Sequence, residues 1–293
     1  MKKIVITGAN GFIGSFLLKK LSQNNNYKIL ALVHRMPKQI LNNIEYSIYE
    51  MGKTTKQELN NLIDNYDVII HCAWQPYINK KSNDININSV ETIADICQKK
   101  NIKQLIYLSS MSAHNEAISN YGKTKYICEQ LLAGYPFVTT IKPGLVIGNG
   151  GLFENICKLI KKSFVIPLPE KGKQPIHTIN IFNLYQTLNY SIEYGITGTY
   201  LACEPKPVTI YSLYKEIAYL LNKKIFILNT NYNLMNIIIS LSNSLYITKI
   251  SKENLLGLKQ LKDINFFLPQ TPLFPFIEYD NYKISITKTL HDK

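Results

Sequence analysis

Short apolar runs alternate, through the first half of the chain, with stretches in which apolar residues recur every three or four positions. The runs predict strands, and the recurring positions predict helices with one buried face. The predicted strands are Lys3–Thr7, Lys28–Val33, Glu45–Tyr49, Val68–Cys72, Leu105–Ser109 and Phe137–Lys142, and the predicted helices are Phe12–Ser22, Ser89–Lys99 and Lys123–Leu132. Because apolar strands alternate with helices, they predict an α/β fold with a doubly wound parallel sheet covered on both faces.

The alternation ends near Pro143. Glycine and proline cluster at 143–151 and 167–175, and a further helix is predicted at 209–221. We therefore expect a first domain over 1–150, to which 175–204 returns, and a smaller second part made of 151–174 and 205–293.

Composition describes a globular chain with a sizeable core. Of its 293 residues 46% are hydrophobic and 18% charged, which excludes a disordered chain. The most apolar late stretch, Leu234–Ile250, is interrupted by asparagines and serines, so no membrane span is predicted. The five cysteines are scattered and form no CxxC pair. They indicate free thiols, no metal site and a reducing compartment, and we expect a cytoplasmic protein.

The net charge is +13, from 33 basic and 20 acidic residues. Such a charge attracts anionic partners, but the lysines are spread along the sequence, and abundant lysine, asparagine and isoleucine are typical of an AT-rich genome. No basic segment with interleaved aromatic residues predicts nucleic-acid binding. Arg35 differs from the other basic residues because it is the sole arginine of the chain.

A glycine-rich stretch, TGANGFIG at 7–14, lies between the first predicted strand and the first predicted helix. Gly8 permits a tight turn, Gly11 the close approach of a pyrophosphate, and Gly14 the packing of helix on strand. The spacing is GxxGxxG, and its context predicts a dinucleotide-binding Rossmann domain. The predicted cofactor contacts in this loop are Gly8, Asn10, Gly11, Phe12, Ile13 and Gly14.

The residues after the second strand bear on which dinucleotide binds. An NAD-binding protein commonly has an acidic residue there, whereas this chain has His34 and Arg35. An arginine can hold the 2′-phosphate of NADP in a bidentate fork that lysine cannot copy. We predict that His34 and Arg35 contact the cofactor and favour NADP(H), with NAD(H) as the alternative.

Tyr121 and Lys125 form a Tyr-x-x-x-Lys pair leading into a helix. Residues four apart share a helix face, so the ammonium can lie near the phenol and lower its pKa, as a general acid/base requires. Ser109 and Ser110 end the preceding strand, where a serine can bind a substrate oxygen.

Taken together, these motifs resemble the extended short-chain dehydrogenase/reductases, in particular the nucleotide-sugar epimerase, dehydratase and reductase group. The resemblance covers nearly the whole chain. It rests on TGANGFIG (7–14), DVIIHCAW (67–74), INSVETI (87–93), IYLSSMSAH (106–114), YGKTK (121–125), IKPGLVIGNG (141–150) and QPIHTINIFNL (174–184).

The resemblance implies roles for particular residues. Tyr121 is the acid/base, Lys125 its partner, Ser110 orients the substrate, and Asn88 supports the lysine through a water. The implied cofactor contacts also include Cys72, Ala73, Trp74, Pro143 and Gly144, with Tyr121 and Lys125. Implied substrate contacts are Ser112, Lys173 and His177. A histidine at the position of His71 has a structural role in this family.

Departures from the family pattern narrow the chemistry. Met111 and Ser112 stand where the dehydratases have an Asp-Glu pair, and Met111 also replaces a cysteine of the fucose-nucleotide epimerase/reductases. We therefore expect neither activity. Lys173 stands near the position of an arginine that relatives use on the diphosphate.

Three functions remain open. The first is NADPH-dependent reduction of a 4-keto nucleotide-diphospho-6-deoxysugar, the second an NAD-dependent C4 epimerase of a UDP-sugar, and the third a non-catalytic dinucleotide-binding protein. The presence of Ser110, Tyr121 and Lys125 argues against the third. We expect a nucleotide-sugar substrate, no nucleic acid, no membrane insertion, and a homodimer formed through the helices near 89–99 and 123–132.

Overall fold

The computed structural model describes residues 1–41, 43–234 and 252–291, so the apolar stretch Leu234–Ile250 lies outside the described residues after its first residue. The chain divides into two compact units. The first unit holds 1–115, 120–142 and 185–200, and the second holds 116–119, 143–184 and 201–293. Within the described ranges, no helix is long and apolar enough to cross a membrane.

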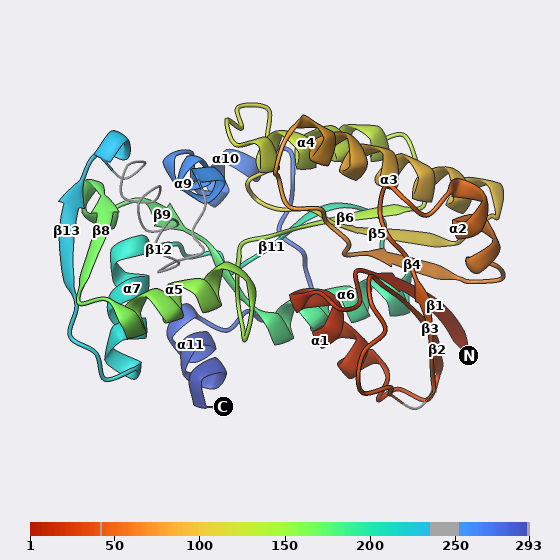
Figure 1. Ribbon diagram of the computed structural model, residues 1–293, viewed down its shortest axis with the longest axis horizontal. Coiled ribbons are helices and arrows are strands. Elements are labelled where there is room, and N and C mark those ends of the chain that lie inside the picture. The colour runs from red at the N-terminus through yellow and green to blue at the C-terminus, as the bar shows by residue number, and fades with distance from the viewer. Residues whose placement is uncertain (42, 235–251, 292–293) are drawn as a thin grey trace. The chain divides into compact units, whose positions relative to one another are not determined.

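A seven-stranded sheet forms the centre of the first unit, with the strand order β11-β6-β5-β4-β1-β2-β3 (Figure 1). The pairs from β6 through β3 are parallel. The strands are β1 (Lys2–Thr7), β2 (Tyr27–Val33), β3 (Ile44–Ile48), β4 (Val68–His71), β5 (Gln104–Leu108), β6 (Val138–Pro143) and β11 (Gly198–Ala202). This doubly wound order confirms the predicted α/β class.

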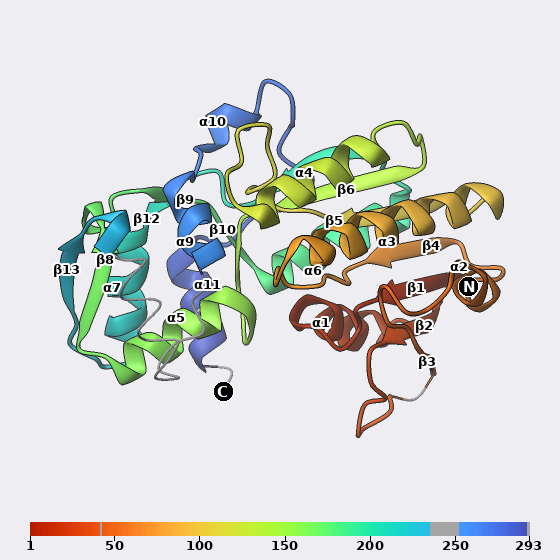
Figure 2. The same cartoon turned by 45° about the horizontal axis from the view of Figure 1, so that its top comes forward.

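Helices cover the sheet on both faces, as Figure 2 shows: α2 (Lys56–Leu62), α3 (Lys80–Lys99) and α4 (Asn120–Leu132) on one, and α1 (Phe12–Leu21) and α6 (Ile181–Tyr194) on the other. The first face packs into a core that includes Ile69, Ile93 and Tyr107. Strands β4 and β5 are buried along their whole length, since helices lie on both sides.

Helix α3 begins nine residues before the predicted Ser89. Its first turns are polar, so apolar periodicity does not reveal them. The start is fixed by a capping box, in which the Asn79 side chain accepts from the Ser82 N–H and the Ser82 side chain accepts from the Asn79 N–H. The sequence pattern predicts neither α2 nor α6, nor the helices of the second unit other than the one at 209–221.

The second unit is built around α5 (Gly151–Lys162), α7 (Ile210–Leu220) and α11 (Tyr282–His291), with a core that includes Phe153, Leu213 and Ile286. Its strands pair as β7 (Leu145–Ile147) with β10 (Thr178–Asn180), β9 (Pro175–Ile176) with β12 (Val208–Thr209), and β8 (Val165–Pro169) with β13 (Phe226–Thr230). The short helices are η1 (Glu170–Gly172), α9 (Lys252–Lys259) and α10 (Ile264–Phe267).

The unit boundaries differ from the expected domain boundaries. The chain leaves the first unit after Lys142 rather than after 150, and it is back in the first unit over 185–200 rather than 175–204. Strands β7, β9 and β10 pair within the second unit, which accounts for the difference.

Candidate active site

Strands β1 and β4 are neighbours in the sheet, and the strand order reverses between them. From β1 the chain continues to β2 and β3 on one side, and from β4 it continues to β5 and β6 on the other. In doubly wound sheets a ligand-binding crevice forms at the carboxyl ends of the strands at this switch point. Gly8 follows β1 there, and Cys72, Ala73 and Trp74 follow β4.

The glycine loop after β1 forms a cradle that only glycine can form. Gly8 has a φ of +65°, and a Cβ there would lie 2.7 Å from the Cα and N of Ala73. A Cβ on Gly14 would lie 2.3 Å from the Gly8 carbonyl oxygen. Gly11 caps α1 without a side-chain hydrogen bond, so the helix begins with its N–H groups directed at the loop. The loop therefore fits a dinucleotide pyrophosphate.

The other predicted cofactor contacts lie in the same loop and directly after the second strand. Asn10 is exposed, and Phe12 and Ile13 are half-buried in the first turn of α1. His34 and Arg35 directly follow β2 and are both exposed. The guanidinium is thus available at the carboxyl end of a strand that pairs with β1.

Lys125 lies buried on α4 and faces the end of β5. Its Nζ donates to the Leu108 carbonyl at 2.6 Å and lies over the Trp74 and Tyr107 rings, at 4.0 and 4.7 Å from their centroids. Burial lowers the pKa of Lys125 to about 8. The ammonium is held by one carbonyl and two aromatic faces, a geometry that desolvates it while stabilising its charge.

Tyr121 and Ser110 are brought together at the same strand ends. The Ser110 side chain is hydrogen-bonded to Tyr121, and the Trp74 ring meets the Tyr121 ring edge-on, with centroids 5.4 Å apart. Burial raises the pKa of Tyr121, and the Ser110 hydrogen bond opposes that rise. The prediction that Lys125 lowers this pKa is wrong for the structure, because burial dominates and the opposing contribution comes from serine.

His71 is fully buried within β4. Its Nδ1 and Thr7 Oγ1 share a hydrogen bond of 2.8 Å, and the same Thr7 oxygen accepts from the Ala73 N–H at 3.2 Å. Burial lowers the pKa of His71 to about 3, so the ring is neutral at ordinary pH. These bonds join the ends of β1 and β4 and agree with the structural role expected of His71.

The predicted role of Asn88 needs a correction. Asn88 is exposed on α3, so its amide does not support the buried ammonium of Lys125. The buried amide of this stretch is Asn86, which accepts from the Gln75 N–H at 2.8 Å and donates to the Gln75 and Ser82 carbonyls at 2.9 Å. Asn86 thereby fixes the loop that follows Trp74.

A buried ion pair next to the site has no counterpart among the residues predicted from the sequence. Glu129 lies one turn beyond Lys125 on α4 and contacts Lys142 Nζ at 2.7 Å, with both side chains almost fully buried. Glu129 also accepts from Ser109 Oγ, and Lys142 donates to the Ala113 carbonyl at 2.6 Å. The pair therefore holds the residues on either side of Ser110. The sequence signal for this pair is Lys142, a charged residue at the end of the apolar strand β6.

The remaining predicted residues lie as follows. Ser112 is half-buried and donates its N–H to Ser110 Oγ at 3.1 Å. In the second unit, Pro143 and Gly144 follow Lys142, and a Cβ on Gly144 would meet the His177 carbonyl oxygen at 2.5 Å. Lys173 is exposed directly after η1.

His177 is not available to a substrate. It is buried, its Nδ1 donates to the Glu204 carbonyl at 2.9 Å, and its Nε2 accepts from the Ile264 N–H at 3.0 Å. Both ring nitrogens are engaged by the backbone of the second unit, so the predicted substrate contact is wrong and His177 is structural.

Known proteins are similar in sequence to the part of the chain that carries the glycine loop and Tyr121. A profile of the NAD dependent epimerase/dehydratase family matches residues 4–150, half of the chain. The chain belongs to this family. Members are NAD(P)-dependent enzymes, and this chain is one of them.

Individual relatives are distant. The UDP-glucose 4-epimerase of Vibrio cholerae is 22% identical over 255 residues, 76% of each chain. The crystal structure of gox2253 superposes with a TM-score of 0.74 at 13% identity, covering 99% of this chain and 97% of that one. MoeE5 in complex with UDP-glucose and NAD superposes with a TM-score of 0.65 at 17% identity, covering 78% and 85%. At these identities the structural likenesses show the fold.

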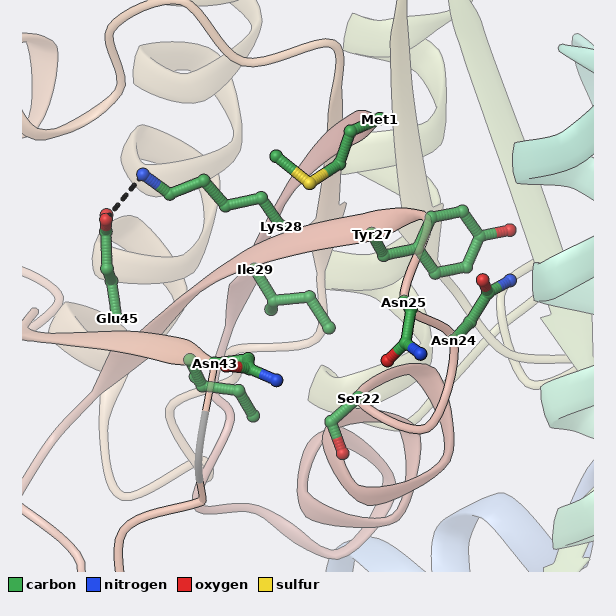
Figure 3. Close-up of a pocket in the computed structure, with 10 residues that line it drawn as sticks. Met1, Ser22, Asn24, Asn25, Tyr27, Lys28, Ile29, Asn43 and Glu45 are labelled. Carbon is green, nitrogen blue, oxygen red and sulfur yellow. Dashed lines mark ion pairs between the residues drawn. The ribbon is translucent and has the colours of Figure 1, made fainter.

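A hollow of about 520 Å³ lies away from the glycine loop and from Tyr121 (Figure 3). It is lined at the amino ends of β1, β2 and β3 by residues such as Met1, Asn24 and Lys28, and Lys28 pairs with Glu45 at 2.7 Å. Because ligands of doubly wound sheets bind at the carboxyl ends, this hollow is not the active site. Among the described residues, no group of three His, Cys, Asp or Glu side chains is arranged to hold a metal.

The glycine cradle gives a direct test. Gly8→Ala places a Cβ against the Ala73 backbone at a positive φ, which costs about 1–3 kcal/mol and narrows the pyrophosphate site. We expect urea unfolding at a lower denaturant concentration and at least about tenfold weaker NADH and NADPH binding. Gly134→Ala is the matched control, because nothing lies within 4 Å of its Cβ. Equal dinucleotide affinity in the two variants would contradict the assignment.

The buried ion pair gives a second test. Lys142→Met leaves the Glu129 carboxylate unpaired, and such a loss destabilises by about 3–5 kcal/mol. Adding Glu129→Gln removes the orphaned charge, so the double variant should recover much of the free energy of unfolding in urea. If Lys142→Met unfolds at the same denaturant concentration as the unaltered chain, the pair does not hold the loop.

Proposed function

We propose that this enzyme reduces the 4-keto group of a nucleotide-diphospho-6-deoxysugar with NADPH. The observation that carries the proposal is the hydrogen bond between Ser110 and Tyr121 at the same strand ends as the glycine cradle. An acid and a substrate-orienting hydroxyl beside a dinucleotide site are the groups that ketone reduction needs.

Each residue has a distinct task in this proposal. Bound NADPH supplies the hydride. Ser110 Oγ donates to the substrate's C4 oxygen, and Tyr121 Oη transfers its proton to that oxygen as the ketone becomes an alcohol. The raised pKa of Tyr121 keeps the phenol protonated and ready to donate. Lys125, cationic beside Trp74, would hold the nicotinamide ribose.

The preference for NADP(H) rests on Arg35. Its exposed guanidinium follows β2, where the 2′-phosphate of NADP is read in doubly wound folds. No acidic residue stands at 34 or 35 to bind the ribose hydroxyls of NAD instead. A nucleotide-sugar substrate is supported by relatives, since MoeE5 is solved with UDP-glucose and NAD.

A second candidate is an NAD-dependent C4 epimerase of a UDP-sugar. The similarity to the Vibrio cholerae UDP-glucose 4-epimerase favours it, and it uses the same Ser110, Tyr121 and Lys125. The two candidates differ in net redox: the reductase consumes NADPH, whereas an epimerase returns the hydride to the sugar and keeps its cofactor.

We also propose a homodimer joined through α3 and α4. The two helices pack against each other, and α4 exposes Ile127 and Leu131, which lie four residues apart on one face. A cytoplasmic location is supported by the five cysteines, all of which are free thiols.

Removing the phenol tests the chemistry. Tyr121→Phe deletes the proton donor and should lower kcat by about 10²–10⁴-fold. The rate is followed as NADPH oxidation with a panel of 4-keto sugar nucleotides. Tyr126→Phe, a half-buried position on the same helix, is the control and should keep its rate. Full turnover by Tyr121→Phe would exclude its role.

The cofactor preference is tested at Arg35. Arg35→Ala removes a charge-assisted fork and should weaken NADPH binding by about 10–100-fold while leaving NADH binding almost unchanged. Arg35→Lys keeps the charge but not the fork, and should recover only part of the loss. The unaltered protein is also denatured and its released dinucleotide identified. Release of NAD in a one-to-one ratio to the protein would contradict NADPH-dependent reduction and favour the epimerase.

A further inference from the structure

A short motif, Lys-Lys-x-Phe, occurs twice in the second unit. Lys161, Lys162 and Phe164 follow one another at the end of α5, and Lys223, Lys224 and Phe226 come shortly after α7. The two copies are some sixty residues apart in sequence, and neither alone is basic or aromatic enough to stand out.

The fold places the two copies side by side. Each leads into a strand of the parallel β8–β13 pair, with Phe226 opposite Val165. The Phe226 N–H donates to the Phe164 carbonyl at 2.8 Å. Both views of the chain show β8 and β13 adjacent, following α5 and α7 (Figures 1 and 2).

Apolar side chains of these segments face solvent. Phe164 is 65% exposed, Phe226 56%, and Tyr219 near the end of α7 78%. Val165 and Leu228 on the two strands are also exposed. Exposed aromatic groups gathered on adjacent segments, rather than scattered singly, are typical of an interaction surface.

The charges within these two segments are of one sign. All four lysines are exposed, and 161–165 and 219–228 contain no acidic residue. Within the part of the chain that the structure describes, none of the four makes an ion pair. Lys161 and Lys162 complement the carboxyl end of α5, and Lys223 lies at the carboxyl end of α7, where its N–H donates to the Ala218 carbonyl at 2.8 Å.

We propose that this surface, the Lys-Lys-x-Phe surface, binds peripherally to anionic lipid bilayers. Exposed phenylalanines enter the headgroup–acyl boundary, while the lysines remain at the level of the lipid phosphates and pair with them. Neither contribution suffices alone, since the apolar area is small and charge alone is screened by salt. The enzyme would thus work at a membrane surface without spanning it.

The same chemistry is less suited to a nucleic acid. The surface contains no arginine, the residue most used to grip phosphates and guanines. Its aromatic residues lie at the beginnings of two paired strands rather than along a groove that could follow a strand of bases.

The test is co-sedimentation of the full chain with vesicles of phosphatidylcholine alone and of phosphatidylcholine mixed with phosphatidylglycerol. We expect binding to the mixed vesicles only, weakening as salt is raised. Each lysine near an anionic surface contributes about fivefold to partition, so changing Lys161, Lys162, Lys223 and Lys224 to Gln should lower it by at least about tenfold. Phe164→Ala with Phe226→Ala should lower it as well.

Matched controls separate the surface from overall charge. Changing the exposed Lys19, Lys80, Lys81 and Lys99 of the first unit to Gln removes the same charge and should leave partition within about twofold. Tyr194→Ala, also exposed, is the aromatic control. Urea unfolding verifies that each variant remains folded.

Three results would overturn the proposal: no binding to mixed vesicles, equal binding to neutral vesicles, or equal losses in the lysine variants of the two units. Binding of a short DNA duplex that the Lys-Lys-x-Phe changes abolish, without vesicle binding, would assign the surface to nucleic acid instead. None of these results depends on which reaction the enzyme catalyses.

Discussion

The site depends on the close approach of two loops at the reversal of strand order. Gly8 after β1 lies so near Ala73 after β4 that no Cβ fits between them. Thr7 and His71 fix this approach through a shared hydrogen bond, and the Thr7 oxygen also receives the Ala73 N–H. The pyrophosphate cradle and the place of Trp74 follow from it, because both loops begin at these strand ends.

Burial of charge organises the catalytic half of the site. Tyr121, Lys125 and Glu129 recur at four-residue intervals on α4, so one helix face carries an acid, a cation and a carboxylate into the interior. Desolvation opposes each charged form, and each charge has a partner: a carbonyl and aromatic rings for Lys125, Lys142 for Glu129. The ion pair also holds the chain around Ser110, because Lys142 donates to the Ala113 carbonyl and Glu129 accepts from Ser109 Oγ. The buried charges therefore help to position the Ser110 hydroxyl.

Features with a local pattern in the sequence can be predicted from it, and features without one cannot. The six strands β1 to β6 were predicted to within a residue at each end, because the strands of a buried parallel sheet are largely continuous apolar runs, whereas β11 and the short strands of the second unit were not predicted. The first turns of α3 were missed because they are polar. The family motif predicts Asn88 as the supporting amide, but Asn88 is exposed and Asn86 is buried, because a motif gives the order of residues and not which one faces inward.

The sequence by itself determined the doubly wound fold and the glycine loop, because periodicity and the backbone freedom of glycine act over a few residues. Only the tertiary structure paired Glu129 with Lys142, engaged both nitrogens of His177, and assembled the surface around Phe164 and Phe226. Each of these joins residues from separate elements. Their partners are chosen by how helices and strands pack, which no single stretch of sequence encodes.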